Sequence, residues 1–362
     1  MAMGRARTYG LSRARTMQSN SPVNEMAESS VGLSDRLTDL VQQRHLVSPY
    51  DGSALSLADG GLLSEGGHRF PIIEGVPVML RWDKAPNFDK QFELTRGFVD
   101  GHDKGTLELP DFYGDPEKTI RLYKETQGAY SGKMYDGAAF RRFSIPKPPL
   151  RSWGYGRSFL DVGSGWGRFC FGAQLNGYNA FGVDPSLHNI LFGKSIAKLL
   201  GLEYDAIAAD GRYLPFSDGA FEAINSWGML HHLSDENYEL VIREIGRVLR
   251  AGGDSVLQIS NLWSPRHFLL KSRRADYDKE QFGVRFRSPP QIKQTLGALI
   301  GATEILAHGY FTISNCIADN DIITRKFVPM NTVSHYLGTL ANWLRFPRHF
   351  ADSVYARSTK AS

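Results

Sequence analysis

The sequence predicts an α/β fold, in which a doubly wound parallel sheet follows a small β module. After Arg157, short apolar segments alternate with helical patterns, which is typical of parallel strands joined by right-handed crossovers. A glycine-rich turn follows the first of these segments, as it does where a strand enters a helix beside a ligand. Residues 37–80 instead contain short apolar stretches separated by Gly and Pro, a pattern that predicts small strands and turns.

Seven strands and several helices are expected in the sheet region. The strands are Ser158–Val162, Ala180–Asp184, Asp205–Ala209, Glu222–Ser226, Asp254–Ser260, Thr303–Tyr310 and Asp352–Arg357. Helical patterns cover His188–Leu200 and Asp235–Arg250. Ser234 is expected to cap the second of these helices, and Gly252-Gly253 to end it.

Four regions are predicted along the chain. They are a disordered basic arm (1–33), a small β module (34–82), a linker and helical cap (83–150), and the sheet domain (151–362) with lid-like insertions at 261–287 and 311–350. Within the linker, helices are expected around Glu117–Thr126 and near Lys133–Phe143.

Composition and charge exclude several classes of protein. Hydrophobic residues make up 42% of the 362 residues, enough for a sizeable core, so a wholly disordered chain is excluded. The net charge of +4 equals the excess carried by four arginines near the N-terminus: Arg5, Arg7, Arg13 and Arg15. The remainder is neutral on balance, so we expect no nucleic-acid partner. No segment approaches the roughly eighteen apolar residues of a membrane span, so none is expected.

The N-terminus and the cysteines bear on cellular location. Cys170 and Cys316 are too few for a disulfide framework, and no cluster has zinc-ligand spacing. The Arg-rich start is similar to an organelle transit peptide, but we interpret it as a disordered arm or as a start codon assigned too early, since Met17 and Met26 follow. We therefore expect a cytoplasmic protein, and leave open whether residues 1–20 belong to the mature chain.

A turn and three acids follow the first three strands of the sheet. The segment 161–167 reads Asp-Val-Gly-Ser-Gly-Trp-Gly, whose G-x-G-x-G spacing lets a ligand approach the backbone and differs from the G-x-G-x-x-G of dinucleotide sites. Asp184 and Asp210 end the next two strands. Because ligands bind at the carboxyl edge of such a sheet, these residues predict a nucleoside site, with Asp184 on the ribose and Asp210 on an adenine amino group.

Together these motifs resemble the class I S-adenosylmethionine-dependent methyltransferases, and specifically their ubiquinone/menaquinone-type small-molecule group. The resemblance covers about residues 130–310. It rests on four motifs in order: 161–167, Asp184, 210–221 with Leu214-Pro215-Phe216, and 230–233 with its His-His pair. It implies S-adenosylmethionine as cofactor, a seven-stranded Rossmann-like methyltransferase sheet, and a small-molecule acceptor such as a hydroxyl of a glycan, lipid or quinone-like metabolite.

The resemblance also implies a role for each site residue. Asp161 and the turn glycines Gly163, Gly165 and Gly167 hold the methionine end of the cofactor. Asp184 takes the ribose, while Asp210 and Gly211 take the adenine. Backbone around Ser226 approaches the methionine moiety, and Tyr135-Asp136 resembles a segment that closes over the cofactor.

Methyl transfer from a sulfonium mainly requires an aligned nucleophile, and a base is needed only if the acceptor must lose a proton. By position, His231 is the candidate base. A His-His-Leu sequence is common in the family whatever the substrate, however, which favours packing or a cap instead. Two other functions stay open: a cofactor-binding scaffold or activator without turnover, and an NAD-dependent dehydrogenase, which the glycine spacing and Asp210 disfavour.

Two insertions and the N-terminal module complete the predictions. Segment 261–287 carries seven basic and three acidic residues with interleaved aromatics. It is therefore either a lid over an acidic or phosphorylated acceptor or a solvated loop with anchoring aromatics. Segment 311–350 contains an apolar helical face: Val333, Tyr336, Leu337, Leu340, Trp343 and Leu344. This face could cover a lipid-like substrate, form a dimer surface or pack on the domain. The oligomeric state is not predicted.

The module at 34–82 resembles the small zinc-ribbon domain that activates certain methyltransferases. The family's cysteines are missing, since Ser48 and Asp51 stand where a Cys-Pro-x-Cys pair would be. We therefore predict this fold without the metal, in a structural or docking role.

Overall fold

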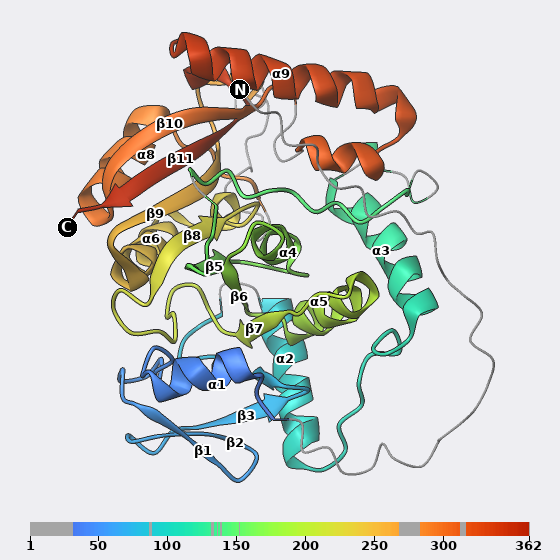
Figure 1. The fold of residues 1–362 in the computed structure, drawn as a ribbon, viewed down its shortest axis with the longest axis vertical. Helices are drawn as coiled ribbons and strands as arrows, with labels where there is room; N and C mark the ends of the chain where they lie inside the picture. Colours follow the sequence, from blue (N-terminus) through green and yellow to red (C-terminus); the bar gives the residue numbers. More distant parts are fainter. Residues whose placement is uncertain are drawn as a thin grey trace.

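A seven-stranded sheet forms the centre of the molecule (Figure 1). The computed structural model describes residues 32–361, apart from 87–88, 132–133, 136, 138–139, 152, 268–282 and 312–315. Nearly all of the predicted arm, residues 1–31, therefore lies outside the described residues. The strands are β5 (Ser158–Val162), β6 (Asn179–Asp184), β7 (Asp205–Ala208), β8 (Phe221–Ser226), β9 (Leu249–Ser260), β10 (Gly301–Gly309) and β11 (Ser353–Lys360).

The strand order is β10-β11-β9-β8-β5-β6-β7. Strands β5 to β9 pair in parallel, whereas β11 runs antiparallel to both of its neighbours, β9 and β10. The predicted α/β fold with a seven-stranded sheet is confirmed. The order also brings the carboxyl ends of β5, β6, β7 and β8 to one edge, because parallel strands end on the same side.

Helices cover both faces of the sheet. Phe159 in β5 packs in one apolar core with α4 and α5, whereas the next residue, Leu160, packs in a second core with α6 and α8. Successive side chains point to opposite faces of a strand, so each strand contributes to both cores. The helices are α4 (Arg168–Gln174), α5 (Leu187–Leu200), α6 (Asp235–Val248) and α8 (Pro289–Leu299).

The end of α6 differs from the prediction. The Ser234 hydroxyl accepts from the Asn237 backbone N–H at 3.2 Å, as expected for a cap, but the helix ends at Val248. Leu249 already pairs with Phe221 of β8, so strand pairing replaces the last helical residues. Gly252, with φ +73°, consequently lies inside β9 and does not end the helix.

The N-terminal module is a four-stranded antiparallel sheet beside one helix. Its elements are α1 (Asp35–Gln42), β1 (Leu55–Ala58), β2 (Gly61–Ser64), β3 (Arg69–Ile73) and β4 (Val76–Pro77). The Met79 backbone N–H donates to the Ala208 carbonyl at 2.8 Å, and the Val47 N–H donates to Pro215 at 2.9 Å. The module therefore joins the main sheet at its β7 edge (Figure 1), and Leu37 and Leu62 pack in the same core as Leu160.

The linker contains α2 (Asp89–Asp103) and α3 (Pro116–Ser131), and α3 includes the predicted helix at Glu117–Thr126. The helix expected near Lys133–Phe143 is wrong for the described residues of that range. There Tyr135 forms a backbone bridge with Ile323, and the Arg141 N–H donates to the Asp321 carbonyl at 2.9 Å. Pairing with the 311–350 insertion takes the backbone groups that a helix would use.

That insertion contains the longest helix described, α9 (Val328–Leu344), flanked by the short helices η4 (Ile317–Asp321), η5 (Arg325–Phe327) and η6 (Pro347–Phe350). The helix lies at the top of Figure 1, above β10. Among the described helices, none combines the length and hydropathy needed to cross a bilayer.

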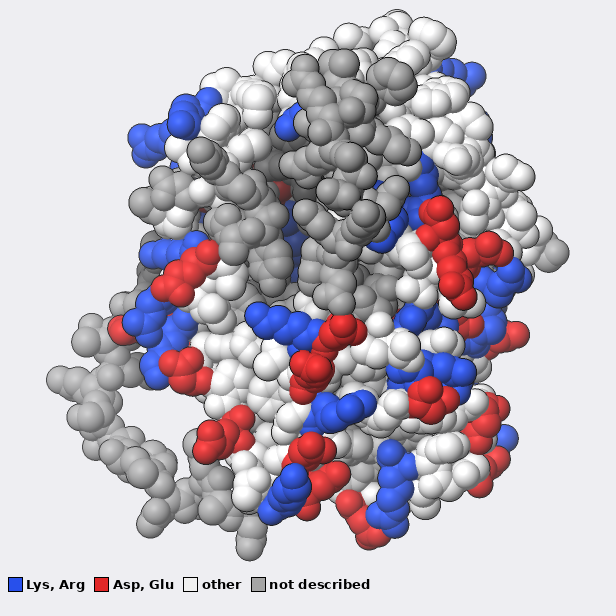
Figure 2. Space-filling view, turned by 180° about the vertical axis from the view of Figure 1, so that it is seen from behind, with Lys and Arg blue, Asp and Glu red and all other residues white. Residues whose placement is uncertain are grey.

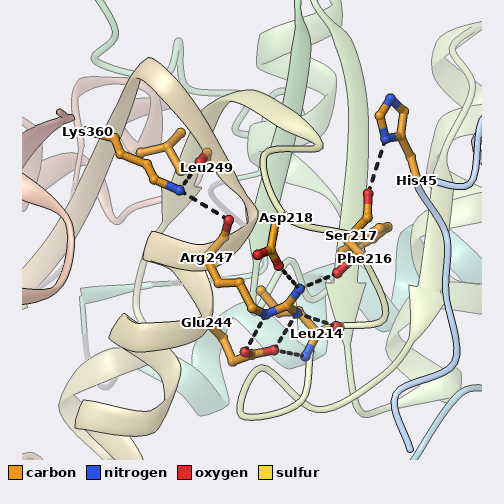
Figure 3. Close-up of polar contacts among 9 residues, drawn as sticks. All are labelled: His45, Leu214, Phe216, Ser217, Asp218, Glu244, Arg247, Leu249 and Lys360. Carbon is orange, nitrogen blue, oxygen red and sulfur yellow. Dashed lines mark hydrogen bonds and ion pairs between the residues drawn. The ribbon is translucent and has the colours of Figure 1, made fainter. Parts of the chain in front are cut away.

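The Leu214-Pro215-Phe216 loop is held by one arginine of α6 (Figure 3). Arg247 donates to the Leu214 and Phe216 carbonyls, at 2.9 Å and 2.5 Å. It also forms a double hydrogen bond with Glu244, at 2.7 Å and 2.8 Å, and Glu244 accepts from the Leu214 N–H at 2.8 Å. The Leu214-Pro215-Phe216 motif is therefore held on α6, and this fixes the segment that leads into β8.

We expect Arg247→Met to lower the free energy of unfolding by about 1–3 kcal/mol, because two carbonyls and the carboxylates of Glu244 and Asp218 lose a donor. Arg243→Met is the matched control, since Arg243 lies on the same helix and pairs with Glu239 in solvent. The control should cost at most about 0.5 kcal/mol. Equal losses in urea unfolding of the two variants would contradict the anchoring role.

Candidate functional site

The glycine-rich turn after β5 requires glycine at three positions. Gly163, Gly165 and Gly167 have φ of +78°, +53° and +83°, a left-handed region that residues with a Cβ rarely adopt. A Cβ on Gly163 would lie 2.8 Å from the Met229 side chain, whereas a Cβ on Gly165 would meet nothing within 4 Å. The turn therefore packs under Met229 on one side and leaves the backbone at Gly165 open to a ligand.

Asp184 joins the end of β6 to this turn. One carboxylate oxygen accepts from the Gly165 backbone N–H at 2.9 Å, and the other accepts from the Ser186 N–H at 3.0 Å. Burial raises the pKa of Asp184 to about 6, although these two hydrogen bonds favour the charged form. The predicted turn and the predicted ribose carboxylate are thus in direct contact.

Asp161 lies beneath the turn, within β5. Its carboxylate accepts from the Asn225 side-chain amide at 2.7 Å. Burial raises its pKa to about 7, the Asn225 hydrogen bond opposes this shift, and the nearby charge of Asp184 adds to it. Ser226, the last residue of β8, is also occupied, because its hydroxyl donates to the Val162 carbonyl at 2.8 Å. The Ser226 side chain therefore ties β8 to β5 at the site.

We expect Asp161→Asn to raise the thermal unfolding temperature at pH 8. The pKa of Asp161 is about 7 in the folded chain and 3.8 as the ordinary value. Between these two pH values the folded state binds more protons at this site than the unfolded state does. The contribution of Asp161 to stability therefore falls as pH rises. The rise in unfolding temperature should shrink towards pH 4. The control variant Asp59→Asn, whose carboxylate is exposed, should show no such rise. A gain independent of pH would contradict this account.

Asp210 is engaged by a residue that the sequence analysis missed. Arg212 donates to both carboxylate oxygens of Asp210, through Nε at 3.0 Å and 3.1 Å and Nη2 at 2.6 Å. Both side chains are buried. Arg212 also donates to the Ala85 carbonyl at 2.8 Å and to the Asn237 side chain at 3.2 Å. The ion pair thus connects the end of β7 with the linker and α6, and an adenine amino group would share Asp210 with Arg212.

Gly211 lies between the turn and α6. A Cβ on it would lie 3.1 Å from Val162 and 3.6 Å from Val241. This close approach brings the backbone after β7 next to the end of β5. The residues predicted for the cofactor on β5, β6, β7 and β8 therefore meet at one edge of the sheet.

A buried ion pair lies next to the turn. Arg168, the residue after Gly167, donates to the Asp319 carboxylate at 2.8 Å and to the Ser144 hydroxyl at 2.9 Å. Asp319 also accepts from Ser144 at 2.6 Å and from the Cys316 backbone N–H at 2.7 Å. Asp319 is fully buried and Arg168 nearly so. This pair connects the turn to the 311–350 insertion.

An aromatic and histidine cluster surrounds the residue that follows β8. The Arg168 guanidinium lies 4.7 Å from the Trp227 ring centroid, and His308 packs edge-on against Trp227 and Tyr355. Burial lowers the pKa of His308 to about 4, so its imidazole is neutral. Among the described residues, the His308 Nε2 has no hydrogen-bond partner. Tyr135 lies near Arg168, whereas its predicted neighbour Asp136 lies outside the described residues.

His231 lies away from that cluster, in η3 (Leu230–His232), and is buried. Its carbonyl accepts from the Arg285 backbone N–H at 2.7 Å. Burial lowers the pKa of His231 well below its usual value, and His232 and Arg287 lower it further. Its Nδ1 finds no partner among the described residues. His231 is therefore a neutral imidazole under the 261–287 segment.

Two arginines of the 261–287 segment serve as anchors. The Arg287 guanidinium lies 3.8 Å from the Tyr238 ring centroid and donates to Asp235 at 2.8 Å, while Arg285 donates to the His232 carbonyl at 3.0 Å. Both also border a cavity of about 520 Å³ between α6 and α8. Four of the seven predicted bases, Lys271, Arg273, Arg274 and Lys279, lie outside the described residues.

Comparisons with known proteins match the part of the chain that contains this edge of the sheet. Residues 159–253 match the family described as "Methyltransferase domain". An uncharacterized methyltransferase from Mycobacterium sp. (strain KMS) is 32% identical over 174 residues, which cover 46% of this chain and 67% of that protein. A probable fatty acid methyltransferase from Pseudomonas putida is 34% identical over 101 residues, covering 27% of this chain and only 25% of that relative.

Solved structures also match the chain, at low sequence identity. A SAM-dependent methyltransferase from Archaeoglobus fulgidus is 16% identical, with a TM-score of 0.41, and the match covers 69% of this chain and 100% of that one. The mycobacterial relative, together with the matching domain, shows that the chain is a methyltransferase. The chain therefore belongs to the class I S-adenosylmethionine-dependent methyltransferases and is an enzyme that uses S-adenosylmethionine.

Proposed function

We propose that the carboxyl edge of β5, β6 and β7 holds the cofactor in one orientation. The methionine end lies at Asp161 and the 163–167 turn, the ribose at Asp184 and the adenine at Asp210–Gly211. The hydrogen bond between the Gly165 N–H and Asp184 carries this proposal, because it joins the two halves of the site. Backbone at Ser226 and the Tyr135 side chain complete the methionine side.

The backbone at Gly165 and the carboxylate of Asp184 are also suited to binding the cofactor. The open approach at Gly165 admits a ligand without Cβ interference, and each Asp184 oxygen accepts one backbone N–H in the structure, while a carboxylate oxygen has two lone pairs. When bound, the cofactor supplies a methyl group activated on a sulfonium sulfur. The protein's task is then to position the acceptor and exclude water.

The acceptor is proposed to lie beside Trp227, and the enzyme is proposed to belong to the ubiquinone/menaquinone-type group. Trp227, Tyr355 and Phe169 make these surroundings aromatic, which favours a hydroxyl of a lipid or quinone-like molecule over that of a glycan. Two relatives are named for lipid substrates, the probable fatty acid methyltransferase and a sphingolipid C9-methyltransferase 2 of Gibberella zeae. Both matches cover a quarter of the relative or less.

The acceptor class is tested by incubating the protein with methyl-labelled S-adenosylmethionine and a fractionated cell extract. We expect the label to enter the organic-solvent-soluble fraction. Label in water-soluble glycans would contradict the lipid or quinone-like acceptor. Cofactor binding without transfer to any fraction would contradict a small-molecule acceptor of either kind.

His231 remains a candidate base, with packing as the alternative, and both roles need its neutral form. Because the pKa of His231 is depressed on folding, its contribution to stability is present above about pH 6.5 and is lost as pH falls. We expect His231→Gln to reduce this acid-side loss, measured by urea unfolding between pH 7 and pH 5. A fall in kcat at unchanged cofactor affinity would assign the base role, and an unchanged kcat would assign packing.

The N-terminal module is proposed to act in docking or structure, as a zinc-ribbon-like fold without the metal. Its contacts with the Ala208 and Pro215 carbonyls support this role, because they cover the β7 edge of the sheet next to Asp210.

A further inference from the structure

Helix α9 presents its polar face to the protein and its apolar face to solvent. The inward residues, which are buried, are Asn331, Ser334, Gly338 and Ala341. The outward apolar residues are 38–78% exposed: Val333, Tyr336, Leu337, Leu340, Trp343 and Leu344. His335 and Thr339 are exposed among them. An ordinary surface helix has the opposite arrangement. Packing of this apolar face on the domain, one of the three expectations from the sequence, is therefore wrong.

The inward face explains this inversion. The Ser334 hydroxyl donates to the Tyr310 carbonyl at 2.6 Å and accepts from the Tyr310 N–H at 3.0 Å. The Asn342 side chain likewise accepts from the Ala307 N–H at 2.6 Å and donates to its carbonyl at 3.0 Å. Since β10 is the edge strand of the sheet, these side chains pair backbone groups that an edge strand leaves open. A polar face is thus needed inside, and the apolar face is left outside.

The apolar face continues beyond the helix. Phe346 and Phe350, in and beside η6, are 72% and 40% exposed and lie 5.6 Å apart by ring centroids. We call these two residues and the six outward residues of α9 the α9 apolar surface. Scattered exposed hydrophobic residues are common, but a contiguous set of this kind marks an interaction site.

The charges around this surface indicate what it contacts. Residues 322–351 contain no Asp or Glu, whereas Arg325 and Lys326 precede α9, and Arg345 and Arg348 follow it. Three of these four bases are exposed, while Arg348 pairs with Glu304. At the top edge of Figure 2, where Figure 1 places α9, the atoms that are not grey are white, with Lys and Arg at the margins.

We propose that the α9 apolar surface docks on the surface of an anionic lipid bilayer. A helix with Trp, Tyr and Leu outward and bases at both ends lies along the boundary of headgroups and acyl chains, where its bases contact lipid phosphates. A second copy of the chain fits less well. Symmetric pairing, parallel or antiparallel, would bring the bases of one α9 against the bases of the other, which is unfavourable.

The proposal is tested by flotation of the full chain with vesicles of phosphatidylcholine, alone or mixed equally with phosphatidylglycerol. We expect binding to the mixed vesicles, weakened by salt. Leu340→Ser/Trp343→Ser should reduce the partition coefficient at least about tenfold, since two apolar side chains lose their burial. The matched control is Leu57→Ser/Leu94→Ser, which removes exposed apolar residues elsewhere and should bind like the wild type.

A second variant separates charge from apolar contact. Arg325→Gln/Arg345→Gln should weaken binding to the mixed vesicles about 30-fold, at roughly 1 kcal/mol for each base, and should make the residual binding less sensitive to salt. Three results would overturn the proposal. They are a wild-type chain that does not float with mixed vesicles, a Leu340/Trp343 variant that floats equally well, and light scattering in which that variant turns a wild-type dimer into a monomer.

Discussion

Asp184→Ala should weaken the binding of S-adenosylhomocysteine by about 10- to 150-fold. This corresponds to about 1.5–3 kcal/mol, the scale of losing hydrogen bonds to a charged group. The variant loses the proposed ribose contacts, and it also removes the acceptor of the Gly165 and Ser186 N–H groups. We therefore expect the glycine-rich turn to lose its hydrogen bond and the proposed ribose site to lose its carboxylate in the same variant.

The matched control for this experiment is Glu203→Ala. Glu203 precedes β7, at the opposite edge of the sheet, and its side chain is 77% exposed. Its removal should leave the dissociation constant from titration calorimetry unchanged. Unchanged affinity in Asp184→Ala, with a thermal unfolding profile that shows a folded protein, would remove Asp184 from the cofactor site.

Arg168→Met should lower the free energy of unfolding by about 3–5 kcal/mol, the range for removing one partner of a buried ion pair. Asp319 would then be a buried charge without a cationic partner. Its remaining donors would be the Ser144 hydroxyl and the Cys316 backbone N–H. Because Arg168 follows the glycine-rich turn directly, cofactor binding should weaken as well.

A double variant identifies the ion pair as the cause. In Arg168→Met/Asp319→Asn no buried charge remains without a partner, so this protein should be more stable than Arg168→Met alone. Urea unfolding of the wild type, both single variants and the double variant completes the cycle. Strictly additive losses would contradict a direct coupling between the two side chains.

The meeting of the candidate cofactor residues at one sheet edge could be predicted from the sequence, because it depends on local features of the chain. A turn with glycines at alternate positions and acids that end successive strands meet whenever the strands are parallel, and the contact between Gly165 and Asp184 follows from that rule. The paired strands and the Ser234 cap are similarly local features. The predicted end of α6 was wrong because Leu249 pairs with Phe221, which is distant in the sequence. This strand pairing ends the helix before the glycines that were expected to end it.

Other features depend on contacts between distant segments. Arg168 and Asp319 are separated by 151 positions, and no periodicity relates them. The pairing of Arg212 with Asp210 is local, but a sequence shows only two neighbouring charges and not their burial. The pattern of α9 showed which residues share a face. It could not show that the other face pairs with the edge strand β10.

The central claim is that this sheet edge binds an S-adenosyl cofactor and not a dinucleotide. Titration calorimetry of the wild-type chain with S-adenosylhomocysteine and with NAD tests it most directly. We expect saturable binding of S-adenosylhomocysteine and no heat of binding with NAD. Selective binding of NAD would contradict it.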